Sequence, residues 1–187
     1  MNKIVVDAVV EIPMNTKNKF EVDKRRDKIK LDRVLYSSMN YPSEYGFIEE
    51  TLELDGDPLD ILVISSEPTF PGCIVPARVV GNLRILDSGK PDNKIISVVD
   101  VDPRFDYVQE LNDLSDFTLR EIVNFFENYK TLQGIEVKVL GYEDKEAALK
   151  VIETCRERLK EAKKKEQEKE EEKKEEEKKE KSKAEKE

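Results

Sequence analysis

The sequence predicts an α+β fold, in which a small closed antiparallel β-barrel is flanked by two α-helices and followed by a charged C-terminal tail. Short Val- and Ile-rich segments separated by Pro and Gly fill residues 1–110, which is typical of an antiparallel barrel rather than a doubly wound sheet. Apolar residues at helical spacing appear only after this region. Beyond residue 162 the apolar positions disappear, and Lys and Glu dominate.

The expected strands combine a high content of β-branched residues with alternation of apolar and polar positions. Turn residues separate them, as at Pro42, Gly56, Pro71 and Gly89. The expected strands are residues 3–12, 19–23, 28–36, 46–54, 60–64, 74–86, 94–101 and, after the first helix, 135–140.

Two amphipathic helices are expected after the first seven strands. Ser115 is a suitable N-cap for the first helix, and Gly134 is expected to end it. Its apolar face consists of Leu119, Ile122, Val123 and Phe126. The second helix begins near Asp144. Its apolar face consists of Ala148, Val151, Ile152, Cys155, Leu159 and Ala162.

Two parts of the chain follow from this pattern: a domain over residues 1–162 and a Lys/Glu-rich tail over residues 163–187. A domain of that size is long enough to bury a core, whereas the tail has too few apolar residues to do so. Its Glu and Lys residues offer i,i+4 pairs worth about 0.3–0.5 kcal/mol each. The tail is therefore expected to extend the second helix as a solvated rod or to be disordered.

The composition excludes several classes of function. The chain has 33 Lys and Arg against 42 Asp and Glu, and no His. The acidic balance argues against binding to nucleic acid or to an anionic membrane, and the lack of His excludes Ser–His and Cys–His nucleophile pairs and His-based zinc sites. Cys73 and Cys155 are expected to be free thiols in a reducing compartment. No apolar run approaches the roughly 20 residues that span a bilayer, so a soluble, cytoplasmic protein is expected.

The most informative segment is Leu-Asp-Gly-Asp-Pro-Leu-Asp at residues 54–60. It places Asp55, Asp57 and Asp60 on a turn tightened by Gly56 and Pro58, directly before an apolar strand. Mutual repulsion makes such a turn unfavourable unless cations occupy it. Oxygen ligands on a rigid turn are what Mg²⁺ prefers, so the segment predicts a magnesium site.

A second acidic loop, residues 87–94, carries Asp87 and Asp92. By itself it indicates an ordinary hairpin, but together with the first turn it places two carboxylate-rich loops on a small barrel. Cations and phenolic hydroxyls elsewhere in the chain could meet an anionic ligand. These are Lys19, Arg33, Lys94, Lys130, Tyr41, Tyr45 and Tyr129.

The chain resembles the soluble, magnesium-dependent inorganic pyrophosphatases of family I in their short bacterial form. The resemblance covers about residues 3–160 and its most specific motif is the Asp-Gly-Asp-Pro-x-Asp pattern at 55–60. It also includes, in order, Glu11-Ile12-Pro13, Lys19 to Asp23, Asp32-Arg33, Tyr41 to Gly46, Asp87 to Lys94 and Phe125 to Lys130. It implies an OB-like barrel, a homohexamer, and hydrolysis of inorganic pyrophosphate to two orthophosphates by direct attack of a metal-activated water.

The resemblance also implies roles for individual residues. Asp55, Asp60 and Asp92 would hold the first magnesium ion, with Asp60 also reaching a second, and Asp57 would accept the proton of the attacking water. Asp87, Asp92 and Glu21 would bind the ions that arrive with the substrate. The residues implied to bind pyrophosphate are Lys19, Arg33, Tyr45, Lys94, Tyr129 and Lys130, with Glu11 and Tyr41 supporting the rim of the site.

Three positions depart from the family pattern. Ser88 stands where the family usually has Glu, so weaker binding of the substrate-borne metals is expected; Asn124 and Asn128 stand where bacterial hexamers often have His. An alternative interpretation is a catalytically impaired, cation-binding barrel that acts as a scaffold through its charged tail. The presence of Asp57 argues against it, because a cation store needs no acid placed to take up a proton.

Overall fold

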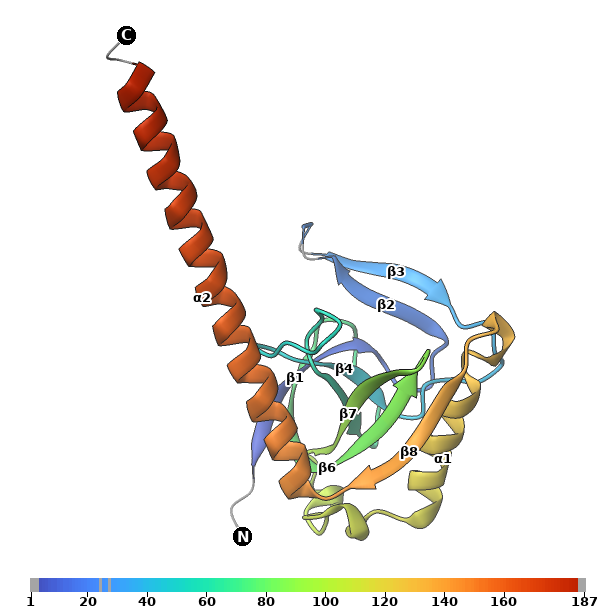
Figure 1. The fold of residues 1–187 in the computed structure, drawn as a ribbon. Coiled ribbons are helices and arrows are strands. Elements are labelled where there is room, and N and C mark those ends of the chain that lie inside the picture. The colour runs from blue at the N-terminus through green and yellow to red at the C-terminus, as the bar shows by residue number, and fades with distance from the viewer. Residues whose placement is uncertain (1–3, 24, 27, 185–187) are drawn as a thin grey trace.

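A computed structural model describes the backbone of residues 4–23, 25–26 and 28–184, and the side chains as far as Lys169. The strands are β1 (Val5–Ile12), β2 (Asn18–Asp23), β3 (Lys28–Val34), β4 (Glu44–Ile48), β5 (Asp60–Ile64), β6 (Ile74–Asp87), β7 (Lys90–Val99) and β8 (Val137–Glu143). The helices are α1 (Asp116–Asn128) and α2 (Lys145–Ala184), with short 3-10 turns at Pro103–Phe105, Leu111–Asp113 and Thr131–Gln133. Figure 1 shows β2 and β3 as a separate hairpin beside the barrel and α2 extending far beyond it.

The main sheet closes into a barrel. Its strand order is β1-β4-β5-β7-β6-β8, and an additional pairing between β1 and β6 joins the sheet back onto itself. Every pairing is antiparallel except the one between β5 and β7, which is parallel. The predicted α+β barrel is therefore confirmed, with one parallel pair in it. That pair is possible because the long strand β6 supplies the crossover that parallel neighbours need.

The two helices cover two separate parts of the core. Side chains alternate along β5 and β7, so that Leu62 and Ile96 belong to a cluster with α1, whereas Ile61 and Ile95 belong to a cluster with α2. Helix α1 contributes Ile122, Phe125 and Phe126 to the first cluster, and α2 contributes Ala148, Ile152 and Cys155 to the second. The predicted face of α1 is confirmed, with Phe125 as a buried residue that was not predicted, and the predicted face of α2 is confirmed from Ala148 to Cys155. Leu159 and Ala162, which were also predicted, belong to neither cluster.

Gly46 allows β1 and β4 to approach each other closely. A Cβ atom at this position would lie 1.9 Å from the backbone oxygen of Val9, so any other residue would push the strands apart. Tyr45, the neighbouring residue, projects from the same strand toward the acidic residues described below.

Several predicted boundaries were wrong by a few residues. The strand expected over 46–54 ends at Ile48, since Glu50 adopts a φ of 56° and Thr51 turns the chain by bonding Ile48 and Leu59. Helix α1 ends at Asn128, and Gly134 instead ends the following 3-10 turn with a φ of 70°. The strand expected over 135–140 runs from Val137 to Glu143. Lys3, the predicted start of the first strand, lies outside the described residues.

Helix α2 continues into the Lys/Glu-rich region without interruption as far as Ala184. Lys164 and Glu168 form one of the expected i,i+4 pairs, with 3.9 Å between Nζ and Oε1. The pairs expected beyond residue 169 lie outside the described side chains. Among the helices that the structure describes, none is both long and apolar enough to cross a lipid bilayer.

Candidate active site

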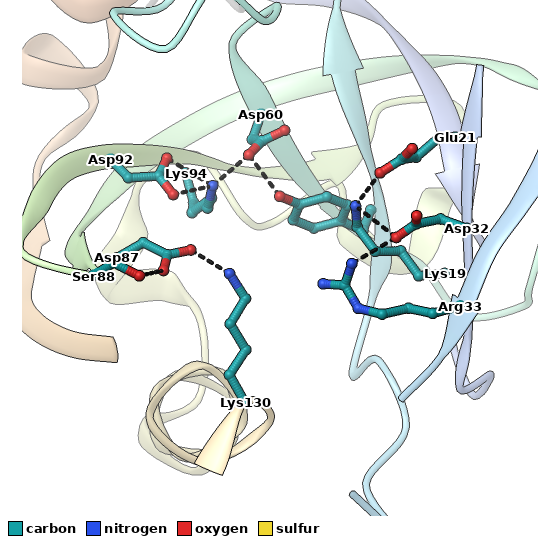
Figure 2. A network of polar contacts seen from close by, with 11 residues as sticks. Lys19, Glu21, Asp32, Arg33, Asp60, Asp87, Ser88, Asp92, Lys94 and Lys130 are labelled. Atoms are coloured by element: carbon teal, nitrogen blue, oxygen red, sulfur yellow. Dashed lines mark hydrogen bonds and ion pairs between the residues drawn. The ribbon is translucent and has the colours of Figure 1, made fainter. Parts of the chain in front are cut away.

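Lys94 forms the centre of a buried ionic cluster. The parallel pairing of β5 and β7 sets Asp60 opposite Lys94, and Asp92 lies two residues before Lys94 on the same face of β7. The Lys94 ammonium donates to Asp60 Oδ2 and, at 2.7 Å, to each oxygen of Asp92. Figure 2 shows Lys94 lying between these two carboxylates. Lys94 is only 3% exposed, so its positive charge is stabilised by the carboxylates of Asp60 and Asp92 in place of water.

The charges in this cluster shift the pKa values of its members. Burial alone would lower the pKa of Lys94, but the carboxylates of Asp60 and Asp92 outweigh it and raise that pKa above its ordinary value. Burial raises the pKa of Asp92, and the charge of Lys94 offsets part of this effect. Lys94 therefore stays protonated, and its ammonium group holds the side chains of Asp60 and Asp92 close together.

Aromatic residues form one wall of the cluster. The Tyr45 hydroxyl donates to Asp60 Oδ2 at 2.6 Å, and the Tyr45 ring packs 5.4 Å from the ring of Tyr41. Tyr129 follows α1 and stacks on Phe125 with 5.0 Å between ring centres. Burial raises the pKa of Tyr41, Tyr45 and Tyr129 above the usual phenol value. All three hydroxyls therefore remain protonated and can act as hydrogen-bond donors.

The β2–β3 hairpin presents a second ionic group. Lys19 Nζ lies 2.5 Å from Glu21 Oε1 and 3.7 Å from Asp32 Oδ2, and Arg33 Nη1 donates to Asp32 at 2.6 Å. Figure 2 shows this group, including Asp32, across from Asp87 and Asp92. The hairpin therefore holds the predicted residues Lys19, Glu21 and Arg33 together.

Asp32 joins this group although it was not among the site residues predicted from the sequence. The register of the hairpin passes from Lys19 opposite Arg33 to Phe20 opposite Leu31, so Asp32 is an extra, unopposed residue in β3. Such a β-bulge turns a side chain away from its regular alternation, which explains why Asp32 lies beside Arg33. The only signal in the sequence was its place in the Asp32-Arg33 motif.

Asp87 and Lys130 form a third ion pair. The Lys130 ammonium donates to Asp87 Oδ2, and the same ammonium lies 5.3 Å from the centre of the Tyr129 ring. The β6–β7 hairpin turns directly after Asp87 at Ser88 and Gly89, whose φ angles of 52° and 79° are those of a tight I′ turn. The hydroxyl of Ser88 donates to Asp87 Oδ1 at 3.1 Å. Ser88, which stands where the family usually has Glu, thus contacts the preceding acid.

The acidic turn that carries Asp55 and Asp57 lies at the surface. The Asp57 amide donates to Asp55 Oδ1 at 3.0 Å, and Gly56 between them has a φ of 94°. Asp55 and Asp57 are exposed, whereas Leu59 is fully buried and anchors the end of the turn. The turn thus presents two carboxylates outward and leads into β5, where Asp60 joins Lys94.

Glu11 supports the site from β1. Its Oε1 atom accepts the Val22 amide at 2.9 Å and so ties β1 to the hairpin strand that carries Glu21. Burial is the main cause that raises the pKa of Glu11 to about 7. Glu11 is therefore protonated more readily than an ordinary Glu, and it acts as a structural acceptor.

The donor set fits a hard divalent cation. Within the described part of the chain, no three acidic or thiol side chains lie close enough together to hold a metal ion as they stand. Ammonium groups lie against Asp60, Asp92, Asp87 and Glu21 instead. Even so, the acidic donors of the site are all carboxylate oxygens. Those of Asp60 and Asp92 converge on one positive group, the Lys94 ammonium. Both features suit Mg²⁺ better than a soft metal.

Carboxylates set among lysines, an arginine and tyrosine hydroxyls on a barrel are typical of an enzyme site for a phosphorylated anion. The sequence pattern of the inorganic pyrophosphatase family matches residues 8–160. The chain therefore belongs to the inorganic pyrophosphatase family, whose members are metal-dependent hydrolases.

Individual relatives agree closely with this assignment. The inorganic pyrophosphatase of Halalkalibacterium halodurans is 54% identical over 156 residues, which cover 83% of this chain and 96% of that protein. That of Geobacillus stearothermophilus is 54% identical over 162 residues, which cover 87% and 98%. The crystal structure of the inorganic pyrophosphatase from Thermus thermophilus superposes with a TM-score of 0.81 at 46% identity, covering 83% of this chain and 91% of that one.

Proposed function

We propose that this chain hydrolyses inorganic pyrophosphate to two orthophosphates, with Mg²⁺ as its metal and water as the direct nucleophile. One observation carries the proposal furthest: Asp60 and Asp92, from neighbouring strands, converge on a single cationic point beside the Tyr45 hydroxyl in a chain of this family. When bound, magnesium ions would lower the pKa of water and neutralise charge that develops on the phosphoryl oxygens.

The acidic residues divide into two groups in this proposal. Asp55, Asp60 and Asp92 would hold the first magnesium ion, and Asp60 would also contribute to a second. Asp87, Asp92 and Glu21 would hold the ions that arrive with pyrophosphate. The supporting geometry is that Asp60 and Asp92 share one ammonium, while Asp87 and Glu21 each bind a separate lysine. Ser88 contacts Asp87 but brings no charge of its own. The ions that arrive with pyrophosphate should therefore need a higher magnesium concentration than they would with Glu at position 88.

The cations and hydroxyls bind the substrate. Lys19, Arg33, Lys94 and Lys130 donate to the phosphoryl oxygens, and the protonated hydroxyls of Tyr45 and Tyr129 add donors without charge. Tyr41 packs between Tyr45 and Phe125 and keeps this wall in place. Pyrophosphate is strongly anionic and the site is rich in carboxylates, so the substrate is bound only together with dications.

Asp57 takes the proton of the attacking water. It lies two residues after Asp55 on the same exposed turn, and its amide donates to Asp55 Oδ1, so the turn itself brings it near one of the proposed metal ligands. A proton acceptor in this position is what distinguishes an enzyme from a cation store. Nothing in the relatives favours the scaffold alternative, since they are named inorganic pyrophosphatases.

Phosphate release from pyrophosphate is the direct test of this function. The purified full-length chain should release two phosphates per pyrophosphate when Mg²⁺ is present, and removal of Mg²⁺ with a chelator should abolish the release, because substrate and site then repel each other. Re-addition of Mg²⁺ should restore it. Release that persists without a divalent cation, or no release at saturating Mg²⁺, would contradict the proposal.

The domain boundary at residue 162 and the assembly are part of the same proposal. We place the functional domain at residues 1–162 in the cytoplasm and infer a homohexamer. Asn128 donates to the backbone oxygen of Asn124 at 2.8 Å and to its side chain at 3.0 Å, and both are exposed on α1. A hexamer formed through this face would therefore be held by amides or apolar side chains, with no imidazole contact.

Deletion of residues 163–187 is expected to leave turnover and melting temperature almost unchanged. The contacts that fix α2 to the barrel precede the deletion: Cys155 is buried, and Arg158 donates to the backbone oxygen of Leu52 at 2.7 Å. Thermal unfolding and phosphate release of the truncated chain check this. Unfolding of the truncated chain, or activity below about a tenth of the full-length value, would show that the tail is part of the folded domain.

A further inference from the structure

Glu53 lies directly before the acidic turn, and its backbone closes that turn. The Glu53 amide donates to the backbone oxygen of Asp57 at 2.7 Å, and the Gly56 amide donates to the backbone oxygen of Glu53 at 3.2 Å. These two bonds fold the segment into a compact loop with Asp55 and Asp57 at its outer end. The backbone of Glu53 therefore helps to fix the position of both acids.

The side chain of Glu53 points inward and is held on both oxygens. It is only 13% exposed. Asn93 Nδ2 donates to Glu53 Oε1 at 3.0 Å, and Arg158 Nη1 donates to Glu53 Oε2 at 3.3 Å. The Leu54 amide donates to the same Oε2 atom at 3.1 Å. A partly buried carboxylate with three donors is a strong anchor, because bonds to charged groups are stronger than neutral ones.

Asn93 connects this anchor to the strand of the ionic cluster. It lies between Asp92 and Lys94 on β7, and alternation along the strand points its side chain to the opposite face. Its Oδ1 atom accepts from Asn82 Nδ2 at 3.0 Å, and Asn82 is completely buried in β6. The bond from Asn82 therefore holds the Asn93 side chain in place. Asn93 in turn links Glu53 to Asp92 and Lys94, its neighbours along β7.

Arg158 connects the same anchor to α2. Its Nη1 atom also donates to the backbone oxygen of Leu52, and the Leu52 amide donates to the backbone oxygen of Cys155 at 3.0 Å. The chain just before Glu53 is thus attached to α2 at two points. The acidic turn is fixed between a helix on one side and a strand on the other.

We propose that Glu53 is a positioning residue for magnesium binding: held by Asn93 and Arg158, it sets the turn that carries Asp55 and Asp57 at a fixed separation from Asp92 on β7. The inference rests on the proposed function, because it takes Asp55 and Asp92 as ligands of the same ion. Mg²⁺ demands near-ideal octahedral geometry, so ligands from two segments need a rigid connection. The repulsion between Asp55 and Asp57 would otherwise favour an open turn.

The test compares Glu53→Ala, Asn93→Ala and the double variant, all in the full-length chain without pyrophosphate. Calorimetry with Mg²⁺ alone and amide hydrogen exchange at Gly56 are the readouts. Each single variant should weaken Mg²⁺ binding and speed Gly56 exchange by about tenfold, the effect of losing one charged hydrogen bond. The double variant should be no weaker than Glu53→Ala, because both changes break the same link.

Two further variants complete the experiment. Glu53→Gln keeps an acceptor for Asn93 and should retain most of the Mg²⁺ affinity. Glu49→Ala removes an exposed acid from the same loop and should change neither readout. Unchanged affinity and exchange in Glu53→Ala, additive losses in the double variant, or a lower melting temperature with normal Mg²⁺ binding would each overturn the proposal. None of these readouts uses turnover, so a failure of the proposed function would appear separately, as wild-type protein without phosphate release.

Discussion

Asp57→Asn is expected to lower turnover by about 10²–10⁴-fold, the range usual for loss of a general base, while folding and magnesium binding are largely retained. The reason is that the amide has the shape of the carboxylate but cannot accept a proton. The turn itself should keep its shape, because the substitution leaves two backbone bonds of residue 57 in place. Its backbone oxygen accepts from the Glu53 amide, and its amide donates to Asp55 Oδ1. Steady-state phosphate release at saturating Mg²⁺ measures the effect.

A matched control separates loss of the base from loss of charge. Glu50→Gln removes a carboxylate from an exposed position on the same loop and should keep full turnover. Calorimetry on Asp57→Asn should give a magnesium affinity close to that of the wild type. If Asp57→Asn turns over at a near-normal rate, Asp57 is not the base, and the proton must leave by another route.

The acidic turn was predictable from the sequence because its determinants are local. Gly56 supplies a positive φ, Pro58 restricts the chain, and Leu59 is an obligatory buried residue, so Asp55, Asp57 and Asp60 follow from neighbours within six positions. The parts of both helices that pack on the core were predictable for the same reason, since helical periodicity is a local pattern.

Long-range geometry was less accessible. Glu11 lies at a β-bulge, where the register passes from Val10 opposite Gly46 to Ile12 opposite Tyr45, so simple alternation does not place its side chain. The pairing that sets Lys94 opposite Asp60 is parallel and depends on the crossover through β6. Composition gives no sign of either feature. Lys94 was a candidate only as one of several cations that could meet an anionic ligand, and Glu11 was indicated only by the resemblance to the pyrophosphatases.

Lys94→Met is expected to give the largest loss of stability among single changes in the site. Methionine can fill the space of the buried lysine stem, but it leaves Asp60 and Asp92 facing each other without the ammonium between them. Removing one partner of a buried ion pair leaves an uncompensated charge. The two carboxylates remain 27% and 22% exposed, so we expect a loss of about 3 kcal/mol, the lower end of the usual range. Urea unfolding without Mg²⁺ measures it.

Mg²⁺ should restore more stability to Lys94→Met than to the wild type, because a dication can take the place of the ammonium between Asp60 and Asp92. Hydrolysis should nevertheless stay low, by about 10²–10³-fold, since a donor to the phosphoryl oxygens is lost and metal does not replace it. Lys90→Met changes an exposed lysine at the start of the same strand and should show neither effect. If Mg²⁺ stabilises wild type and Lys94→Met equally, the two carboxylates do not bind a common ion. The proposed first magnesium site would then have to be built from other residues than Asp60 and Asp92.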